Sequence, residues 1–578
     1  MLFTLLVCML SPIKTKTALT IFSFFLFASF IHPFRFEPHT SYFHEILTIL
    51  GLLIVLSYVA TAENPRLVFP KLLFFPVAII VVIVIQLLLK ISLWPEDFLI
   101  PILYFMLVGL AFVIGASLAS QAQGAQDICQ ALAVAYVSAA LLSVVMQMIQ
   151  VAHINAMPFV MPIASGAQPF LRPYANVGQP NQLALLQCLA MASVWWLYQR
   201  RAFGVIASVS AIVFLIAGLA LTQSRIGWII APIFAGLCVR RVEGEKPVSG
   251  VLILLFVTGY IAFVFSLPYV GEIFGFSTGS VERHIGGRSE RWVLIQQAWH
   301  MALNHPWLGV GWFGFGGEQA RIASAFSAAT YSEHSHNLIL NFAAELGLPL
   351  TIIIFFGLSW WFIQCCLLPK ATVISRFSNL ALIALFVHSM VEFPLWYSYF
   401  LIPASLLMGA AHQLRWPSRG ILLKPYIIFA VFLVSSSILV AITLSYQKVT
   451  LAHDTMHLRG LGYQVDMVLT EKPAFTFFPQ LYDELTLAKS TVSDRMSADE
   501  IAFAERVSQR FANDHLLNKM ANIYALNGRP QQSAQAMLTL QRLHPFLYAK
   551  YYDDWKAVAI NDARFAVVLQ SIPKPDVQ

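Results

Sequence analysis

The segment Ser332–Pro349 carries the side chains of this chain that are best suited to chemistry. It reads Ser-Glu-His-Ser-His-Asn, then an apolar stretch, then Glu-Leu-Gly-Leu-Pro. An imidazole ordinarily has a pKa of about 6.5, so a histidine can accept a proton from an alcohol near neutral pH. His336 is therefore the candidate general base, and capping of the helix that follows is the alternative role for it.

The same segment predicts a short helix that begins at His336 and ends at Gly347, because glycine is a common C-terminal stop. A spacing of four places Asn337, Asn341 and Glu345 on one helical face. Polar groups at membrane depth are costly unless they find partners or line a cavity, so this face is expected to line a site.

Arginines supply the complementary charge. The segment Gly286–Trp292 contains Arg288 and Arg291 on either side of Ser289, which is predicted to cap a following helix. Backbone N–H groups, the positive end of the helix dipole and guanidinium forks together favour phosphate there. Arg225 lies at the outer end of a predicted membrane span, where extension toward lipid headgroups is the alternative role.

Two other polar segments adjoin predicted spans. Asn176–Leu183 opens a span, and the amides of Asn181 and Gln182 match the donors and acceptors of sugar hydroxyls. Ordinary helix-entry chemistry explains these amides equally well. Val391–Tyr399 breaks a span at Pro394, and its aromatic side chains are also typical of a membrane-interface belt.

Composition identifies the elements that must position these groups. Of 578 residues, 58% are hydrophobic and 11% are charged, and the mean hydropathy is +0.70. Soluble domains carry about 25% charged residues. The apolar residues form runs long enough to cross a bilayer as helices, so an all-α polytopic integral membrane protein is predicted rather than a soluble one. The net charge of +7 then reflects basic loops and not a nucleic-acid partner.

Thirteen transmembrane helices are predicted, with the N-terminus in the cytoplasm. They span residues 17–32, 44–60, 72–91, 99–120, 127–151, 181–199, 202–222, 226–240, 248–267, 349–368, 377–393, 398–414 and 425–445. This count places most short basic loops inside, whereas the short outside loops carry only Arg35, Arg172 and Arg225.

The predicted organisation has two parts. Residues 1–446 form a transmembrane domain with a large periplasmic loop at 268–348, and residues 447–578 form a soluble, periplasmic, helical domain. Within the latter, Ala521–Pro530 and the run to Pro545 resemble one tetratricopeptide (TPR) helix pair, which is typical of protein contact.

No cofactor is expected. The glycine-rich segment Gly309–Gly317 lacks the Lys-Ser/Thr of a phosphate-binding loop. The six cysteines show neither a CxxC nor a Cys/His spacing, so neither a metal site nor a structural disulfide is predicted.

His-Ser-His-Asn followed by Glu-Leu-Gly-Leu-Pro resembles the signature of the Wzy/WaaL/PglL superfamily, which comprises bacterial O-antigen polymerases, O-antigen ligases and protein O-oligosaccharyltransferases. Segments 176–182, 223–228 and 391–397 resemble the PglL branch in particular, as does the soluble C-terminal part. The resemblance covers nearly the whole chain.

The resemblance implies a metal-independent glycosyltransferase of the bacterial inner membrane, with its active site and C-terminal domain in the periplasm. It would transfer an oligosaccharide from undecaprenyl pyrophosphate to Ser or Thr hydroxyls of periplasmic proteins, pilin being a common acceptor. His336 would be the catalytic base, and Arg225, Arg288 and Arg291 would bind the pyrophosphate. The substrate-binding positions would be Asn181, Gln182, His334, Asn337 and Tyr397.

The implied chemistry agrees with the residues. A pyrophosphate leaves without protonation, so the site needs only cations that stabilise its charge and a base for the acceptor hydroxyl. Attack from the opposite face predicts inversion at the anomeric carbon. The alternatives are an O-antigen ligase acting on lipid A-core, which usually lacks a domain like 447–578, a polymerase, and a transporter, which would not need His336.

Overall fold

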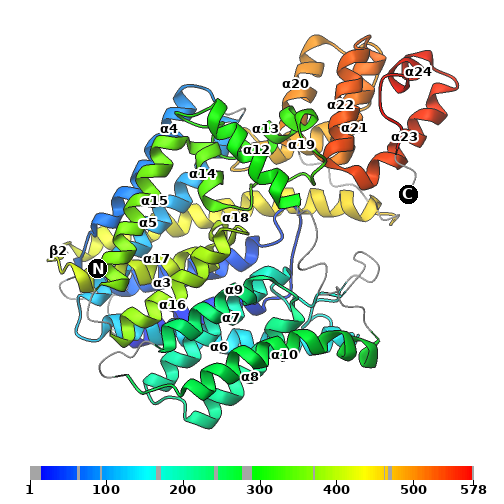
Figure 1. Ribbon diagram of the computed structural model, residues 1–578. Coiled ribbons are helices and arrows are strands. Elements are labelled where there is room, and N and C mark those ends of the chain that lie inside the picture. The colour runs from blue at the N-terminus through cyan, green and yellow to red at the C-terminus, as the bar shows by residue number, and fades with distance from the viewer. Residues whose placement is uncertain are drawn as a thin grey trace. The chain divides into compact units, whose positions relative to one another are not determined.

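The chain is mostly helical (Figure 1). The structure is a computed structural model and describes residues 15–61, 65–91, 94–163, 171–239, 245–275, 290–368, 372–460, 463–465 and 471–575. Within these ranges the one sheet is an antiparallel pair of two-residue strands, β1 (Arg66–Leu67) and β2 (Ile421–Leu422). The all-α membrane class expected from composition is confirmed.

Two compact units divide the chain. The first comprises Met1–Val77, Phe105–Gly287 and Phe356–Ala441, and the second comprises Ala78–Tyr104, Arg288–Phe355 and Ile442–Gln578. The second unit therefore contains the C-terminal residues together with two segments from earlier in the chain. The predicted domain boundary at 446/447 falls inside a continuous helix, α18 (Pro425–Gly460).

The first unit contains most of the apolar helices. They are α2 (Thr15–Ile31), α3 (Tyr42–Ala60), most of α5 (Leu99–Ala119), α6 (Gly124–Val151), α7 (Pro180–Gln199), α8 (Val205–Leu221), α9 (Ile226–Val239), α10 (Gly250–Phe274), α16 (Val373–Ser389), α17 (Ser398–Arg415) and the start of α18; short turns are η1 (Lys71–Leu73), η4 (Ile363–Leu367) and η5 (Pro394–Trp396).

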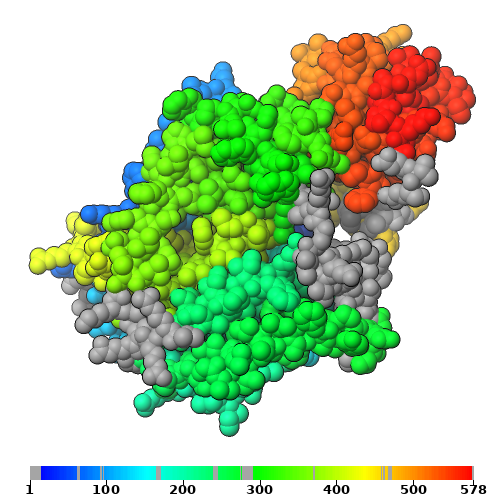
Figure 2. Space-filling model, viewed as in Figure 1, coloured from blue at the N-terminus to red at the C-terminus, as the bar shows by residue number. Residues whose placement is uncertain are grey.

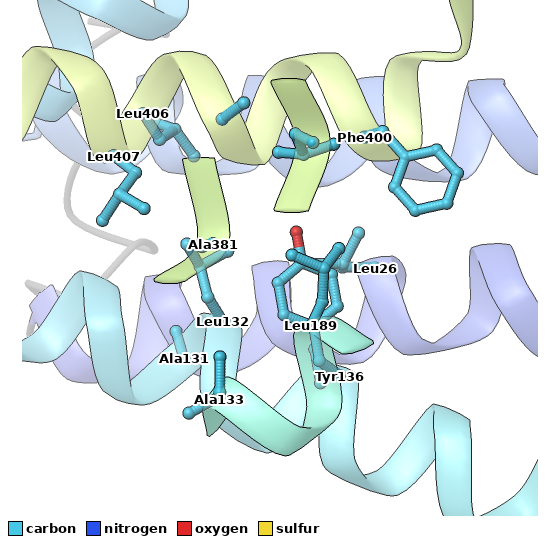
Figure 3. Packing of buried hydrophobic residues seen from close by; sticks show 14 of the residues in the cluster. Leu26, Ala131, Leu132, Ala133, Tyr136, Leu189, Ala381, Phe400, Leu406 and Leu407 are labelled. Carbon is cyan, nitrogen blue, oxygen red and sulfur yellow. The ribbon is translucent and has the colours of Figure 1, made fainter. Parts of the chain in front are cut away.

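The core of the first unit is built by α2, α6, α7, α16 and α17. Figure 3 shows Leu26, Tyr136 and Phe400 pointing toward one another from three of these helices. Small residues allow the helices to approach closely: a Cβ at Gly115 of α5 would overlap the backbone of Leu406 in α17. Such close packing is typical of helices that associate in a bilayer.

The second unit combines membrane-type and polar helices. They are most of α4 (Phe74–Leu88), η2 (Pro95–Phe98), α12 (Glu290–Asn304), α13 (Phe315–Ile322), η3 (Ala323–Ala325), α14 (Leu338–Leu346), the start of α15 (Leu348–Phe362), the end of α18, α19 (Pro479–Lys489), α20 (Ala498–Arg510), α21 (Asp514–Leu526), α22 (Pro530–Leu543), α23 (Pro545–Ala559) and α24 (Ala563–Leu569).

Each of the thirteen predicted spans overlaps a helix. Among the described residues, seven helices are long and apolar enough to cross a membrane: 42–60, 71–88, 99–119, 124–151, 250–273, 348–367 and 425–456. Shorter apolar helices account for α2, α8, α9 and α16. Thirteen crossings stay a prediction, while the membrane class is established by these helices.

Three helices end at residues that differ from the ends of the predicted spans. Helix α10 continues to Phe274 instead of ending at 267, and α18 continues to Gly460 instead of ending at 445. Helix α16 ends at Ser389 rather than 393, before the turn that begins at Pro394. Hydropathy shows where a helix becomes polar, but a helix ends only where its backbone hydrogen bonds end. The polar turns of α18 therefore continue the same series of backbone hydrogen bonds.

The C-terminal helices α19–α24 pack closely (orange to red in Figure 2). The expected helix pair is present as α21 and α22, joined by a turn in which Gly528 has φ +73°. Buried residues such as Met520, Met537 and Trp555 line the faces where these helices meet. The assignment of this pair as a TPR repeat stays a prediction.

Candidate active site

The loop that precedes α14 holds His336 in a strained conformation. The backbone φ of His336 is +55°, a region that non-glycine residues rarely adopt. Its two neighbours are fixed: Ser335 N–H donates to Asn341 Oδ1 (2.9 Å), and Ser335 Oγ donates to the Asn337 carbonyl (2.9 Å). The imidazole is half-buried. Strain of this kind persists only where the surroundings enforce it, which is common at functional sites.

The helix α14 begins two residues later than predicted. It starts at Leu338, because the Asn337 side chain accepts a hydrogen bond from Leu340 N–H (3.0 Å) and so forms the cap. Asn341 and Glu345 share a face as the spacing predicted, and Asn341 Nδ2 donates to Glu345 Oε2 (3.1 Å). This polar ladder connects the end of α14 to the backbone next to His336.

Gln86 of α4 forms hydrogen bonds with the backbone at the C-terminal end of α14 and with the nearby loop. Gln86 Nε2 donates to the carbonyls of Leu308 (2.6 Å) and Glu345 (2.8 Å), and its Oε1 accepts from Trp312 N–H (3.1 Å). Gln86 is fully buried. Gln86 is not among the site residues predicted from sequence, although a lone glutamine in an otherwise apolar membrane helix is a signal that could have identified it.

Gly347 has the conformation that the C-terminal end of α14 requires. Its φ is +87° and its ψ is 163°, a combination that is nearly restricted to glycine. A Cβ there would overlap the carbonyl of Trp307, and the next residue, Leu348, donates its N–H to Pro306 (2.8 Å). The turn therefore joins α14 to the segment that follows α12.

We expect Gly347→Ala to lower the free energy of unfolding by at least about 3 kcal/mol, because strain and overlap add. The matched control is Gly528→Ala, with a φ of +73° but no atom within 4 Å of the added Cβ. That control should lose only about 1 kcal/mol. Thermal unfolding of purified protein in lipid nanodiscs measures both, and equal losses would contradict the overlap argument.

Burial shifts the pKa values of Glu345 and His334 in the directions that favour their neutral forms. Burial raises the pKa of the Glu345 carboxyl to about 8, although the Phe315 N–H donates to it (3.3 Å). Burial also lowers the pKa of His334 to about 4, with Glu333 opposing the shift. His334 therefore stays neutral at physiological pH and acts as a fixed part of the loop.

These shifts make stability depend on pH. A group with a raised native pKa, such as Glu345, contributes stability below its unfolded pKa and loses it as pH rises through about 8. His334 has the opposite sign, but it is neutral in both states above about pH 6.5. From pH 7 to 8 we expect Glu345 to lower the unfolding free energy of wild type by up to about 1.4 kcal/mol per unit, and Glu345→Gln to remove this contribution. Burial raises the pKa of Glu484 to about 7, so Glu484 adds to the slope mainly below this window. Thermal midpoints across this range test it, and parallel slopes would refute the assignment.

Arg510, at the end of α20, connects the C-terminal helices to the loop that contains His336. Its Nη1 lies 2.8 Å from Glu333 Oε1, and its Nε lies 3.1 Å from Asp97 Oδ2 in η2. The Tyr331 hydroxyl donates to the Arg510 carbonyl (3.1 Å). Nothing in the local sequence of Arg510 predicted this role, because its partners lie far away along the chain.

Two of the predicted phosphate-binding arginines are described. Arg291 lies in the first turn of α12, as expected, and is half-buried. Arg225 is exposed and directly precedes α9 in the first unit. Arg288 and the expected cap Ser289 lie outside the described residues. Among the described residues no group of three or more His, Cys, Asp and Glu is placed to hold a metal ion.

In the first unit, the three polar segments resembling the PglL branch converge. Asn181, in the first turn of α7, donates through Nδ2 to Glu392 Oε1 (2.7 Å). Arg172 donates to Asn181 Oδ1 (3.0 Å) and to the carbonyl of Thr222 (3.0 Å), which caps α8 beside Arg225. Arg172 thus joins Asn181 to Thr222, the residue before segment 223–228, and Asn181 in turn contacts Glu392 of the third segment. The outside-loop position of Arg172 alone did not predict this role.

Gln182 and two tyrosines form the next layer of this cluster. Gln182 Oε1 accepts from the Tyr399 hydroxyl (2.8 Å), and its side chain also hydrogen-bonds Tyr397. The two tyrosine rings stack with centroids 5.4 Å apart. Burial raises the pKa of Tyr397 to about 12, so its hydroxyl remains protonated. The predicted pair Gln182 and Tyr397 is therefore together in the structure, with Tyr399 added.

Arg35 fixes the loop that leads into α7. Its guanidinium donates to the carbonyls of Val177 and Asn176. Gly178, with φ +78°, lies against the guanidinium, and a Cβ there would overlap it. Asn176 Nδ2 in turn donates to the Ile31 carbonyl (2.7 Å) at the end of α2. The glycine of the Asn-Val-Gly-Gln-Pro segment is thus required by a close approach of Arg35.

Two known protein-family profiles match parts of this chain. The profile described as "O-Antigen ligase" matches residues 210–355, and the profile described as "Virulence factor membrane-bound polymerase, C-terminal" matches residues 378–560. The first match contains Arg225, Arg291 and His336, and the second contains Tyr397. Both matches support the assignment of the chain to the Wzy/WaaL/PglL superfamily.

Two curated proteins of Acinetobacter baylyi are similar to this chain. A "ComP-specific O-oligosaccharyltransferase" is 25% identical over 394 residues, which cover 67% of this chain and 69% of that protein. A "General O-oligosaccharyltransferase" is 27% identical over 404 residues, which cover 64% of this chain and 66% of that protein. The matches thus span about two thirds of each relative, and the superfamily assignment from the His-Ser-His-Asn signature is confirmed.

Proposed function

We propose that this protein is a protein O-oligosaccharyltransferase that transfers a glycan from a polyprenyl pyrophosphate to Ser or Thr hydroxyls. The observation that carries the proposal is His336, held at φ +55° between Ser335 and Asn337, whose bonds fix the backbone on both sides. A base positioned in this way loses little entropy when the acceptor hydroxyl binds. The names of the two curated relatives support the same reaction class.

The proposed reaction is a single displacement. His336 accepts the proton of the acceptor hydroxyl as its oxygen bonds to the anomeric carbon, and the bond from that carbon to the pyrophosphate oxygen breaks. Arg225, Arg288 and Arg291 hold the pyrophosphate and stabilise the charge that grows on it. Asn181, Gln182 and Tyr397 offer amide and hydroxyl groups for sugar hydroxyls, and His334 and Asn337 shape the loop around the base.

We further propose that undecaprenyl pyrophosphate is the carrier, that the protein lies in the bacterial inner membrane, and that the reaction takes place on its periplasmic side. Residues 447–578 then lie in the periplasm, where a pilin or another protein acceptor is available. The basic residues of the short inside loops support this orientation.

A reconstitution experiment tests the proposal against its rivals. Purified protein in lipid nanodiscs receives a polyprenyl-pyrophosphate oligosaccharide with either a Ser-containing acceptor protein or lipid A-core. We expect the protein acceptor to gain the mass of one whole oligosaccharide. Because both matching profiles bear O-antigen names, the second candidate is a ligase, which would modify lipid A-core instead. A transporter would leave both acceptors unmodified.

A further inference from the structure

Helix α12 presents two different apolar surfaces. One is buried: Leu294, Ala298 and Met301 pack with Phe315 of α13 and Ala344 of α14. Figure 1 shows α12 beside α14 in the second unit. One face of α12 therefore packs in the core of the unit, and the opposite face points outward.

The outward face is apolar as well. Trp292 is 60% exposed, Trp299 is 50% exposed and Leu303 is 54% exposed. Their spacings of seven and four place them in one stripe along the helix. Isolated exposed apolar residues are ordinary, but a stripe with two tryptophans on a single helix marks an interaction surface.

A polar edge runs beside this stripe. Gln296, His300 and Asn304 are exposed and follow one another at spacings of four, and Asn304 Nδ2 contacts His300 Nε2 at 2.7 Å. The helix thus has a water-facing edge next to an apolar stripe. This sidedness is typical of helices that lie in the plane of a membrane interface.

The apolar stripe continues to the start of a membrane span. Trp307, just after α12, is 77% exposed, and its neighbour Pro306 accepts the N–H of Leu348, the first residue of α15. Helix α15 begins the span 348–367, and its exposed Ile352 and Ile353 form the surface that such a helix turns to lipid. Tryptophan is enriched at the level where spans leave the bilayer.

We propose that α12 lies in the lipid–water interface at the N-terminal end of the span 348–367, with Trp292, Trp299, Leu303 and Trp307 in contact with lipid. A lipid surface satisfies both edges of the helix at once, because tryptophan prefers the headgroup level and the polar edge stays in water. This position of α12 also puts Arg291 at the depth of the lipid headgroups. The pyrophosphate of a lipid-linked donor lies at the same depth, and this last step rests on the proposed function.

Depth-dependent quenching tests the placement without measuring transfer. A polarity-sensitive fluorophore is attached to Trp299→Cys, and the matched control is Asn304→Cys on the polar edge of the same helix. The unsubstituted protein serves as a labelling blank, because four of its five described cysteines are buried. In nanodiscs, we expect a headgroup-attached nitroxide lipid to quench position 299 at least threefold more than position 304, and aqueous iodide to show the reverse order.

Two outcomes would overturn the proposal. Equal quenching at the two positions by both reagents would mean that α12 lies in water. Protection of position 299 from both reagents would mean that protein covers the stripe. Trp307→Cys provides a second site should Trp299→Cys fail to fold, with the same expected order. Failure of the proposed transferase function would leave this result unchanged, since quenching reports only lipid contact.

Discussion

Replacing His336 with alanine should reduce glycan transfer by about 10²- to 10⁴-fold, the usual effect of losing a positioned general base. Without the imidazole, the acceptor hydroxyl must lose its proton to water. Donor binding should change little, because the pyrophosphate is assigned to arginines. The measurement is the mass gain of a Ser-containing acceptor protein over time, at donor concentrations that saturate the enzyme.

The positive φ of His336 allows a sharper control. Alanine at φ +55° retains the backbone strain, whereas His336→Gly relieves it, so the glycine variant should be at least as stable as wild type yet equally inactive. His300→Ala, an exposed histidine on α12, should keep full activity. If His336→Gly transferred glycan at more than a tenth of the wild-type rate, the loop conformation and not the imidazole would be the essential feature.

Replacing Arg510 with methionine should destabilise the protein by about 3–5 kcal/mol and abolish transfer. The change leaves the buried Asp97 carboxylate and Glu333 without the cation that both contact. Because Glu333 lies three residues before His336, the loss of the ion pair should also release the loop that holds the base. Thermal midpoint and initial rate are measured on the same nanodisc samples.

Neutralising the partners separates the two effects of Arg510. In Arg510→Met combined with Asp97→Asn and Glu333→Gln no unpaired charge remains, so stability should largely return. Glycan transfer should stay low, because no ion pair between residues 510 and 333 connects the loop to α20. Arg529→Met, which breaks the partly exposed pair with Glu505, is the matched control and should cost about 0–1 kcal/mol. Full transfer by the triple variant would show that Arg510 does not position the loop.

This contact also changes what a C-terminal truncation should do. If residues 447–578 served only to hold the protein acceptor, their removal would affect acceptor choice more than donor hydrolysis. Arg510 lies in the removed part, so truncation removes its contacts with Glu333 and Tyr331 and should also disturb the loop that carries His336. We therefore expect truncation to lower donor hydrolysis together with transfer.

Much of this protein could be predicted from local sequence. Runs of apolar residues located a helix at every predicted span, because a bilayer demands helices long enough to cross it and satisfies no exposed backbone. The short helix after His-Ser-His-Asn, its glycine stop and the Asn341–Glu345 contact were also predictable. Each depends on neighbours within a few residues, where propensity and spacing determine geometry.

Helix ends and long-range partners were not predictable in the same way. The extension of α18 to Gly460 depends on packing of its polar turns, such as the contact of Tyr446 with Phe478. Gln86 can be singled out as a glutamine in an apolar helix, but its partner Glu345, far away in the chain, could not be predicted. Arg172 is an ordinary loop residue, and only its contacts with Asn181 and Thr222 make it important.

The sequence by itself determined the class, a helical membrane protein of the superfamily, and the residue types of its chemistry, because hydropathy and a short signature are local properties. The tertiary structure alone decided that Arg510 contacts the loop of His336 and that Arg172 contacts both Asn181 and the Thr222 carbonyl. It also decided that His336 adopts a left-handed backbone. The physical reason is that a buried charge or a strained residue is stable only with partners, and folding brings those partners from distant parts of the chain.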